Sequence, residues 1–251
     1  MKKKLLSGLF ALAAIFSASA QQVVAHRGYW DIEGSAQNSV RALVKADSIK
    51  CEACEFDVWI TPDNKLFLNH DGVINGHVIE TTSSDTIVAQ KLSNGEYIPT
   101  LEHFFDVAKG LEIDLVLELK PHKNPARENV AVDLIMKMVK EKGLEDRMIY
   151  ITFSRNAFAE FVKVTDRPKM FLTSVDPDEL KAMGATGSDY HFNVYRKNPD
   201  WIERVHKMGM NVNAWTVNLP VDIQWCLDSG VDMITTNDPE LVQKMISEKK
   251  K

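Results

Sequence analysis

Cysteine is scarce in this sequence, with three among 251 residues. Cys51 and Cys54 form a C-x-x-C pair immediately before Glu55, but the chain has no second cysteine pair that would complete a zinc site. The pair is compatible with small packing residues, a local disulfide or a redox pair. Alternation along a strand points the Cys54 side chain away from Glu55. Cys226 lies in a helical pattern and is expected in the core.

An excess of positive charge is also missing. The chain has 30 Lys and Arg against 35 Asp and Glu, which gives a formal net charge of −5. Proteins that bind nucleic acid need a basic surface, and adsorption to anionic lipid needs basic clusters. The composition therefore argues against a nucleic-acid partner and against stable membrane attachment. The sequence gives no indication of the oligomeric state.

No apolar run has the length of about 20 residues that a membrane span needs. One shorter apolar run, residues 5–16, follows three lysines at positions 2 to 4 and precedes the small residues 17–20. This order is typical of a cleavable secretory signal, and no cysteine follows that would carry a lipid anchor. We predict that residues 1–20 are a signal peptide. The mature protein would begin near Gln21 and be secreted or periplasmic.

Linkers rich in proline, glycine or serine are absent as well, so we predict one domain over residues 21–251. Helix starts such as Asp176-Pro177 and Asn198-Pro199 alternate with strand-like runs, as do helix-ending glycines such as Gly143. This alternation predicts parallel βα units of the α/β class. A single TIM-type (β/α)8 barrel is favoured over a doubly wound open sheet, because charged residues cluster at the carboxyl ends of several strands.

The strand candidates number nine, one more than an eight-stranded barrel needs, so one of them is wrong or peripheral. They are residues 23–26, 54–60, 66–70, 113–119, 148–153, 169–173, 190–194, 212–217 and 233–235. Only 12 residues separate Asp57 from His70, too few for a helical crossover. We predict that residues 58–62 run back down and that residues 65–70 climb again. The irregular segment 71–98 is expected to be a loop insertion over the mouth of the barrel.

Two charged pairs stand where strands should be apolar, Glu55-Phe-Asp57 and Glu118-Leu-Lys120. Residues i and i+2 of a strand project from one face, so three carboxylates and an ammonium group point from strand ends. Either pair alone is compatible with an exposed edge strand or a structural salt bridge. A buried charge without a partner costs several kcal/mol, so the set is expected to have a partner. Carboxylate oxygens suit Mg²⁺ or Ca²⁺.

Two apolar runs end in a histidine, one at His26 and one at His70. A single histidine at a strand end is more often a hydrogen-bonded structural residue. Two of them beside these carboxylates can act as general base and general acid near neutral pH. Arg27 and Lys120 can hold an anionic group such as phosphate. Together these groups fit metal-assisted attack on a phosphodiester.

Short motifs follow one another in order along nearly all of the chain after residue 21. They are His26-Arg27-Gly28, Asn38-Ser39, Glu55-x-Asp57, Thr61-x-Asp63, His70-Asp71, Ile98-Pro-Thr-Leu-Glu102, Glu118-Leu-Lys120, Trp215-Thr-Val-Asn218 and Gly230-Val-Asp-x-Ile-Thr235. This ordered set resembles the glycerophosphodiester phosphodiesterase family.

The resemblance implies a TIM-type barrel with a divalent cation at its mouth. The residues that it implies as metal ligands are Glu55, Asp57 and Glu118. His26 and His70 would be the catalytic acid and base. Arg27 and Lys120 would contact the phosphate, and Trp215 would line the site.

Two departures from the family pattern concern the substrate. Gln37 stands where the family usually has a glutamate, in a Pro-Glu-Asn-Thr or Pro-Glu-Asn-Ser motif. Residues 72–82 also differ from the stretch that often follows the His-Asp pair. Both changes fall where a substrate head group could be recognised. We therefore predict that Gln37 is a substrate-binding residue that affects head-group choice more than reaction type.

The function predicted from these residues is an exported, metal-dependent hydrolase that converts glycerophosphodiesters to glycerol 3-phosphate and an alcohol. One alternative is a phosphodiesterase similar to lysophospholipase D or sphingomyelinase D. That enzyme would need an apolar mouth, which Tyr29, Trp30 and residues 73–79 are candidates to supply. The other alternative is a non-catalytic barrel that binds phosphorylated ligands, with Gln37 as a sign of lost activity.

Overall fold

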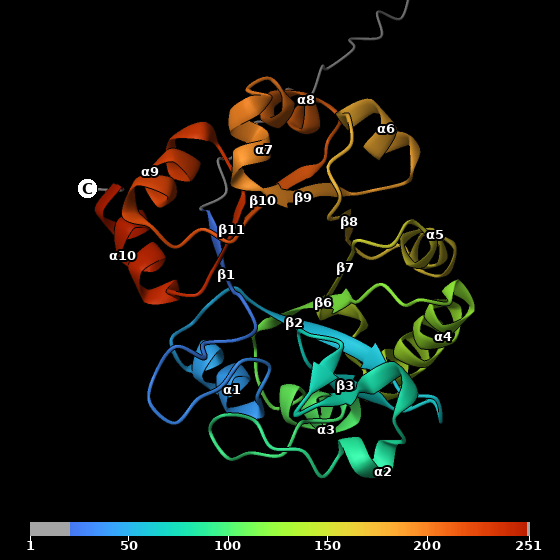
Figure 1. The fold of residues 1–251 in the computed structure, drawn as a ribbon. Helices are drawn as coiled ribbons and strands as arrows, with labels where there is room; N and C mark the ends of the chain where they lie inside the picture. Colours follow the sequence, from blue (N-terminus) through green and yellow to red (C-terminus); the bar gives the residue numbers. More distant parts are fainter. Residues whose placement is uncertain (1–20, 250–251) are drawn as a thin grey trace, which may run out of the picture.

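Eight parallel strands close into a barrel, as Figure 1 shows. The computed structural model describes residues 21–249, so the predicted signal peptide lies outside the described residues. Around the barrel the strands are β1 (Gln22–Ala25), β2 (Ala53–Ile60), β6 (Asp114–Leu119), β7 (Met148–Thr152), β8 (Lys169–Phe171), β9 (Gly187–His191), β10 (Asn211–Trp215) and β11 (Met233–Thr236). The pairing of β1 with both β2 and β11 closes the ring. The TIM-type barrel is confirmed, and the open sheet is excluded.

Helices surround the barrel and connect its strands (Figure 1). They are α1 (Val40–Ser48), α3 (Leu101–Ala108), α4 (Pro125–Lys142), α5 (Arg155–Val164), α6 (Pro177–Ala182), α7 (Phe192–Lys197), α8 (Trp201–Lys207), α9 (Pro220–Ser229) and α10 (Pro239–Lys249). Helix α4 ends at Gly143, whose φ of 68° lies in the left-handed region, as the glycine pattern predicts. None of the helices within residues 21–249 combines the length and apolar character that a membrane span requires.

The apolar side chains form two main layers. The barrel interior is filled by Val24, Ala53, Val116, Ile151, Met170, Leu172 and Met233. A larger layer lies between the barrel and its helices, and Cys51, Cys54 and Cys226 belong to it. All three cysteines are buried and free. The burial of Cys51 and Cys54 agrees with the interpretation as packing residues, and no disulfide joins the two.

The ninth strand candidate is peripheral. It is β3 (Leu66–Leu68), which pairs antiparallel with the end of β2. The predicted directions of these two segments are wrong: β2 continues through Ile60, which is buried, and β3 then descends beside it. His70 still reaches the carboxylates because β3 returns to the level of Asp57, whose carbonyl oxygen accepts the Asn69 N–H at 3.2 Å.

Two boundaries in the second half also differ from the prediction. Strand β9 begins at Gly187 and ends at His191, so the candidate strand 190–194 runs into α7. Asn198 does not start a helix but ends α7, because its N–H donates to the carbonyl oxygen of Val194. Helix α8 begins after Asp200. Asp176 does start α6 as predicted, accepting the Asp178 N–H.

Residues 71–98 form an insertion with short elements of its own. These are β4 (Val73–Ile74), β5 (His77–Val78), η1 (Ile79–Thr81) and α2 (Ser84–Ile87). Its small core consists of Trp59, Phe67, Ile74, Ile79, Ile87 and Ile98. Asn94 donates to the carbonyl oxygen of Gly34 at 3.3 Å, so the insertion contacts the loop that follows β1 at the mouth of the barrel.

Candidate active site

A cavity of about 130 Å³ lies at the carboxyl end of the barrel strands, where barrel enzymes place their sites. The predicted site residues that line it are His26, Arg27, Glu55, His70, Glu118, Lys120 and Trp215. Asp57 lies behind them with 1% of its surface exposed. Gln37 does not line this cavity but a neighbouring one. The closed barrel thus brings together segments that are up to 189 residues apart in the sequence, from His26 to Trp215.

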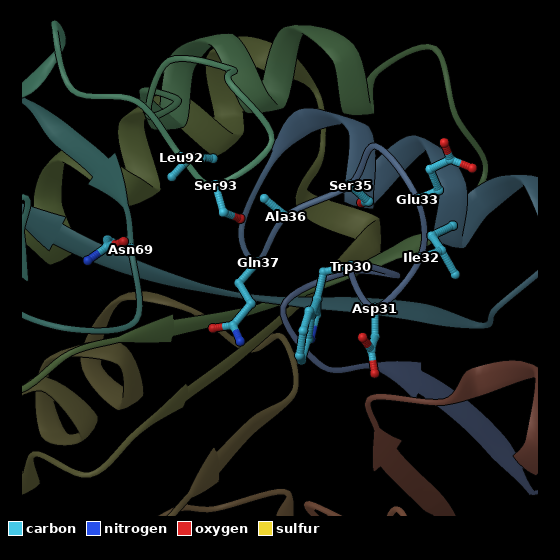
Figure 2. Close-up of a pocket in the computed structure, with 10 residues that line it drawn as sticks. All are labelled: Trp30, Asp31, Ile32, Glu33, Ser35, Ala36, Gln37, Asn69, Leu92 and Ser93. Atoms are coloured by element: carbon cyan, nitrogen blue, oxygen red, sulfur yellow. The ribbon is translucent and has the colours of Figure 1, made fainter.

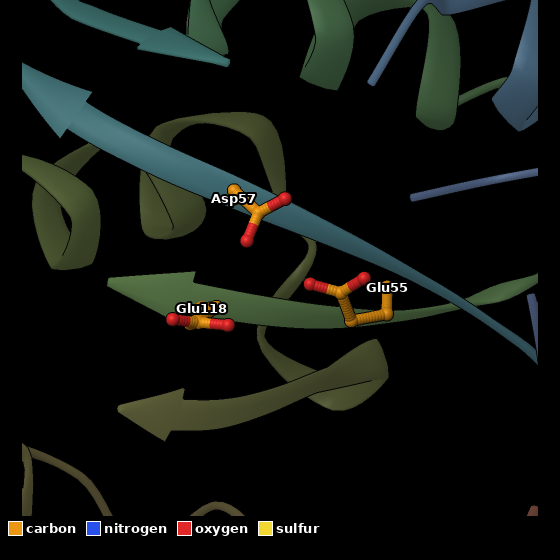
Figure 3. A group of neighbouring side chains, drawn as sticks. All are labelled: Glu55, Asp57 and Glu118. Atoms are coloured by element: carbon orange, nitrogen blue, oxygen red, sulfur yellow. The ribbon is translucent and has the colours of Figure 1, made fainter. Parts of the chain in front are cut away.

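Three carboxylates converge from β2 and β6, as Figure 3 shows. Glu55 and Asp57 share one face of β2, and the parallel register places Asp57 beside Glu118 of β6. Each of the three offers an oxygen that lies within 4.8 Å of the others, and all three side chains are buried. This arrangement supplies three hard oxygen ligands on one side of the cavity.

Ionisation of the three carboxylates is opposed by their burial and by their mutual repulsion. Burial, together with Asp57 and Glu118, raises the pKa of Glu55 well above its ordinary value. Burial and Asp57 raise the pKa of Glu118 to about 8. Burial opposes ionisation of Asp57 too, but Lys120 and Asn38 outweigh it and lower its pKa. Glu55 Oε1 has no hydrogen-bond partner among the described residues. The carboxylates therefore fit a hard divalent cation.

Two cationic side chains border the carboxylates. Lys120 Nζ lies 2.7 Å from Glu118 Oε1 and 3.1 Å from Asp57 Oδ1. Burial acts against its charged form, but these two carboxylates raise its pKa overall. The Arg27 side chain lies 3.8 Å from Asp57, and its backbone N–H donates to Glu55 Oε2 at 2.8 Å. Two basic side chains therefore lie directly beside the carboxylate cluster.

The two histidines differ in their surroundings. His26 Nδ1 lies 2.7 Å from Asn237 Oδ1. Because an amide oxygen only accepts, Nδ1 carries the proton and Nε2 keeps its lone pair. Burial and the charge of Arg27 lower the pKa of His26 to about 4, so its imidazole is neutral at pH 7. His70 Nδ1 instead lies 2.7 Å from Asp71 Oδ1, a carboxylate that orients the ring and compensates its charge when it is protonated.

Three residues of the site were not predicted as site residues. Asn38 holds Asp57, and Asn237 orients His26. Asn38 belongs to a motif that the sequence shows, but its role depends on a contact with β2. Asp189 of β9 lines the cavity with its side chain fully buried. The sequence did not identify Asp189 as a site residue, because it is a single acid outside any motif and lies just before the candidate strand 190–194, whereas β9 begins at Gly187.

Trp215 forms part of the wall, as predicted. Its indole N–H donates to the carbonyl oxygen of Asp189 at 3.0 Å. Phe153 and His191 each pack edge to face against its ring, with centroid distances of 5.7 and 5.6 Å. These contacts fix the orientation of the indole plane. The wall therefore offers a rigid aromatic surface to a small ligand.

A second, more open cavity of about 610 Å³ lies between the loop after β1 and the insertion. Figure 2 shows its lining residues, which include Trp30, Asp31, Glu33 and Gln37. Gln37 Oε1 accepts a hydrogen bond from Arg27 Nη1 at 2.6 Å, and Arg27 lines the active-site cavity, so the two cavities meet at Arg27. Its polar lining suits a water-soluble group.

Comparison with known proteins agrees with this geometry. The model of the glycerophosphoryl diester phosphodiesterase family matches residues 26–241. A glycerophosphodiester phosphodiesterase of Caldanaerobacter subterraneus subsp. tengcongensis is 26% identical over 248 residues, which cover 89% of this chain and 97% of that protein.

Solved structures show the same similarity. A glycerophosphodiester phosphodiesterase from Parabacteroides distasonis is 42% identical with a TM-score of 0.91, covering 92% of this chain and 99% of that one. An Oleispira antarctica phosphodiesterase in complex with the product sn-glycerol-3-phosphate has a TM-score of 0.80 at 21% identity, covering 91% and 97% of the two chains. With this fold, this site and a family match over most of its length, the chain belongs to the glycerophosphoryl diester phosphodiesterase family and is a phosphoric diester hydrolase.

Proposed function

We propose that the protein is an exported, metal-dependent enzyme that hydrolyses glycerophosphodiesters to glycerol 3-phosphate and an alcohol. The observation that carries this proposal is the convergence of three buried carboxylates, two cations and two histidines on one small cavity. Each group has a role in phosphodiester hydrolysis, and the cavity is of a size for a small polar substrate.

Glu55, Asp57 and Glu118 are the residues that would hold Mg²⁺ or Ca²⁺. A bound cation would supply charge stabilisation for a phosphate oxygen and orient a hydroxyl of the glycerol moiety. Lys120 and Arg27 place fixed positive charge at the same edge, where negative charge develops on the phosphoryl group.

The surroundings of the histidines support a division of roles between them. We assign the general base to His26, because its imidazole is neutral and its Nε2 is unprotonated. The attacking hydroxyl, from water or from the glycerol moiety, gives its proton to His26 as its oxygen bonds to phosphorus. The bond from phosphorus to the alcohol oxygen breaks, and His70 gives its proton to that oxygen. Attack by water gives glycerol 3-phosphate directly, and the two histidines then return to their starting protonation by exchange with solvent. Attack by a glycerol hydroxyl gives a cyclic phosphate, which water opens in a second displacement: the water gives its proton to His70, and His26 gives its proton to the ring oxygen that leaves phosphorus. Asp71 lies beside His70 and compensates its charge.

Two observations support a water-soluble substrate over a lysophospholipid. Tyr29, a candidate for an apolar mouth, is buried with 7% exposed and donates its hydroxyl to Glu240. Trp30 lies beside Asp31, Glu33 and Gln37 in the open cavity, which is polar. The charged and polar side chains of this lining disfavour an acyl chain in that cavity. A non-catalytic role is disfavoured because the acid–base and carboxylate residues are assembled.

One assay separates these functions. Purified protein is incubated with glycerophosphocholine and Mg²⁺ or Ca²⁺, and glycerol 3-phosphate is measured with and without lysophosphatidylcholine as competitor. We expect release that lysophosphatidylcholine leaves unchanged and that exhaustive chelation abolishes. Strong competition would favour the lysophospholipase D alternative. Failure to release glycerol 3-phosphate from glycerophosphocholine, together with failure to release choline from lysophosphatidylcholine, would favour a binding protein. Activity that survives chelation would contradict the metal assignment.

Export is the remaining part of the proposal and is supported by the basic, apolar and small residues of positions 2–20. Expression of the full chain in a Gram-negative host, followed by fractionation and intact-mass measurement, provides the test. We expect a product that begins near Gln21 in the periplasm or the medium. An intact Met1 on soluble cytoplasmic protein would contradict the signal prediction.

A further inference from the structure

Asp189 occupies the wall of the active-site cavity that faces the carboxylate cluster. Its strand, β9, lies four strands from β2 in the ring of eight, which is directly across the barrel. The side chain lines the cavity and has 0% of its surface exposed. The proposed mechanism gives this residue no role, although a fully buried carboxylate is costly unless it has partners.

The partners of this carboxylate satisfy only one of its oxygens. Asp189 Oδ1 accepts a hydrogen bond from Asn213 Nδ2 at 2.9 Å. Asn213 is itself held by Thr235, which donates to its Oδ1 at 3.1 Å and accepts from its Nδ2 at 2.9 Å. Asp189 Oδ2 has no partner among the described residues. The network with Asn213 and Thr235 thus leaves one buried acceptor oxygen of a cavity-lining residue unpaired.

A metal ion is not the partner that this geometry favours. The oxygens of Glu55, Asp57 and Glu118 lie within 4.8 Å of one another, and within residues 21–249 Asp189 does not join that group. Lys120 is already engaged by Asp57 and Glu118. The partner of Asp189 Oδ2 is therefore expected to be a hydrogen-bond donor of the ligand. In a small polar ligand this donor is a neutral hydroxyl group.

The shape of the cavity decides which hydroxyl this is. The phosphoryl group is placed by Arg27 and Lys120 on the β2 and β6 side, and apolar atoms of Leu172 and Trp215 line the space toward β9. A ligand that extends across this space has carbon atoms in the middle and a polar end at Asp189. In a glycerophosphodiester that end is the terminal hydroxyl, the one farthest from phosphorus.

We propose that Asp189 Oδ2 accepts a hydrogen bond from the terminal hydroxyl of the glycerol moiety and thereby selects glycerol over alcohols that lack this group. This inference rests on the proposed function. It makes Asp189 a specificity-determining residue for a reaction whose acid–base groups lie elsewhere. A site that holds a buried acceptor for a substrate hydroxyl rejects an analogue without it, because the acceptor stays unpaired.

The test compares two substrates that differ by this one hydroxyl, glycerophosphocholine and the phosphocholine diester of propane-1,2-diol joined through its primary oxygen. Burial raises the pKa of Asp189 to about 7, so the comparison is made at pH 8, where the carboxylate is mostly ionised. Wild type should then prefer the glycerol substrate in kcat/KM by about 10- to 100-fold, the range for a hydrogen bond to a charged group. Asp189→Asn should reduce this preference to about threefold or less. Because the preference is a ratio of two substrates measured on one protein, a general change in turnover cancels from it. Asp133→Asn, on the exposed face of α4, is the matched control and should keep the wild-type preference.

Two further measurements separate specificity from folding and from the proposed function. Asp189→Asn should keep or raise the Tm, because it removes a buried charge with an unpaired oxygen, whereas a purely structural role would lower the Tm. Titration calorimetry should show the same loss of discrimination between glycerol 3-phosphate and propane-1,2-diol 1-phosphate. Equal selectivity of wild type and Asp189→Asn in both measurements would overturn the inference while wild-type hydrolysis still upheld the proposed function. Absence of any wild-type hydrolysis or product binding would overturn both.

Discussion

Asn38 makes two hydrogen bonds to Asp57: its Nδ2 donates to Asp57 Oδ2 at 2.8 Å, and its Oδ1 accepts the backbone N–H of Asp57 at 3.0 Å. Asn38 adopts a left-handed backbone with φ of 58°, and its own N–H donates to the carbonyl oxygen of Arg27. One residue therefore ties the loop after β1 to a proposed metal ligand on β2. A partner of this kind orients the ligand and contributes to metal affinity.

Removing the Asn38 side chain should weaken metal binding. Asn38→Gly keeps the freedom to adopt a positive φ and deletes both contacts to Asp57, so we expect the Kd for Mg²⁺ or Ca²⁺ to rise about 10- to 100-fold. Isothermal titration calorimetry measures the change. Asn64→Gly, at an exposed turn with φ of 65°, is the matched control and should leave the Kd unchanged. An unaltered Kd in Asn38→Gly would show that the hydrogen bonds from Asn38 to Asp57 do not contribute to metal affinity.

The effects of replacing His26 and of replacing His70 should differ when the substrate has a better leaving group. Each alanine variant should lower kcat on glycerophosphocholine by roughly a hundredfold or more, the usual scale for an acid–base group. A 4-nitrophenyl phosphodiester needs little protonation of its leaving group, so His70→Ala should recover most of its activity there and His26→Ala should not. His103→Ala, an exposed residue of α3, serves as the control. Recovery by His26→Ala instead would reverse the assigned roles.

Metal binding should release protons and strengthen as pH rises. Without metal, burial and Asp57 raise the pKa of Glu118 to about 8, and the pKa of Glu55 is also raised. At pH 7 these groups therefore retain protons that a cation must displace, so affinity falls as pH falls below about 8. The expected slope is at most about tenfold per pH unit for each proton released.

Calorimetry in two buffers with different ionisation enthalpies counts these protons. We expect about one or more released at pH 7 in wild type and fewer in Glu118→Gln, which cannot hold the proton in question. Binding that is independent of pH between 6 and 8, with no proton release, would contradict the raised pKa values.

The sequence predicts the parts of this molecule that depend on local periodicity. Alternation within β2 was enough to place Glu55 and Asp57 on one face, and helix starts such as Asp176-Pro177 were correct. The direction of β3 was not predictable, because no local pattern shows whether the chain turns back within residues 58–62 or only after Ile60, as its pairing with Leu66 shows.

Two site residues needed the closed barrel itself. The contact between Asn237 and His26 joins positions 211 residues apart, and only the pairing of β1 with β11 brings them together. The role proposed for Asp189 depends on its position across the barrel from β2, which no local sequence pattern predicts. The reaction type could therefore be predicted from strand-end motifs, while the residues proposed to orient a histidine and to select the substrate could not.

Gln37 should influence head-group choice through Arg27. The amide oxygen accepts from Arg27 Nη1 at 2.6 Å and adds no charge to a cavity that already contains Asp31 and Glu33. A glutamate at this position would pair with Arg27 and place a further negative charge beside the departing alcohol. We therefore expect Gln37→Glu to lower kcat/KM for glycerophosphoserine and glycerophosphoinositol relative to glycerophosphocholine by about three- to tenfold.

The contact with Arg27 can be separated from a general charge effect, because Ser93 lines the same cavity on the insertion side. Ser93→Asp adds an equal charge to the cavity, and among the described residues Arg27 bonds to Gln37 there, not to Ser93. If pairing with Arg27 matters, Gln37→Glu should change the kcat/KM ratios more than Ser93→Asp does. Equal shifts in the two variants would reduce the effect to cavity charge. Identical ratios in wild type and Gln37→Glu across the three substrates would leave Gln37 without a part in recognition, and the loss of the family's glutamate would then have no consequence for the substrate.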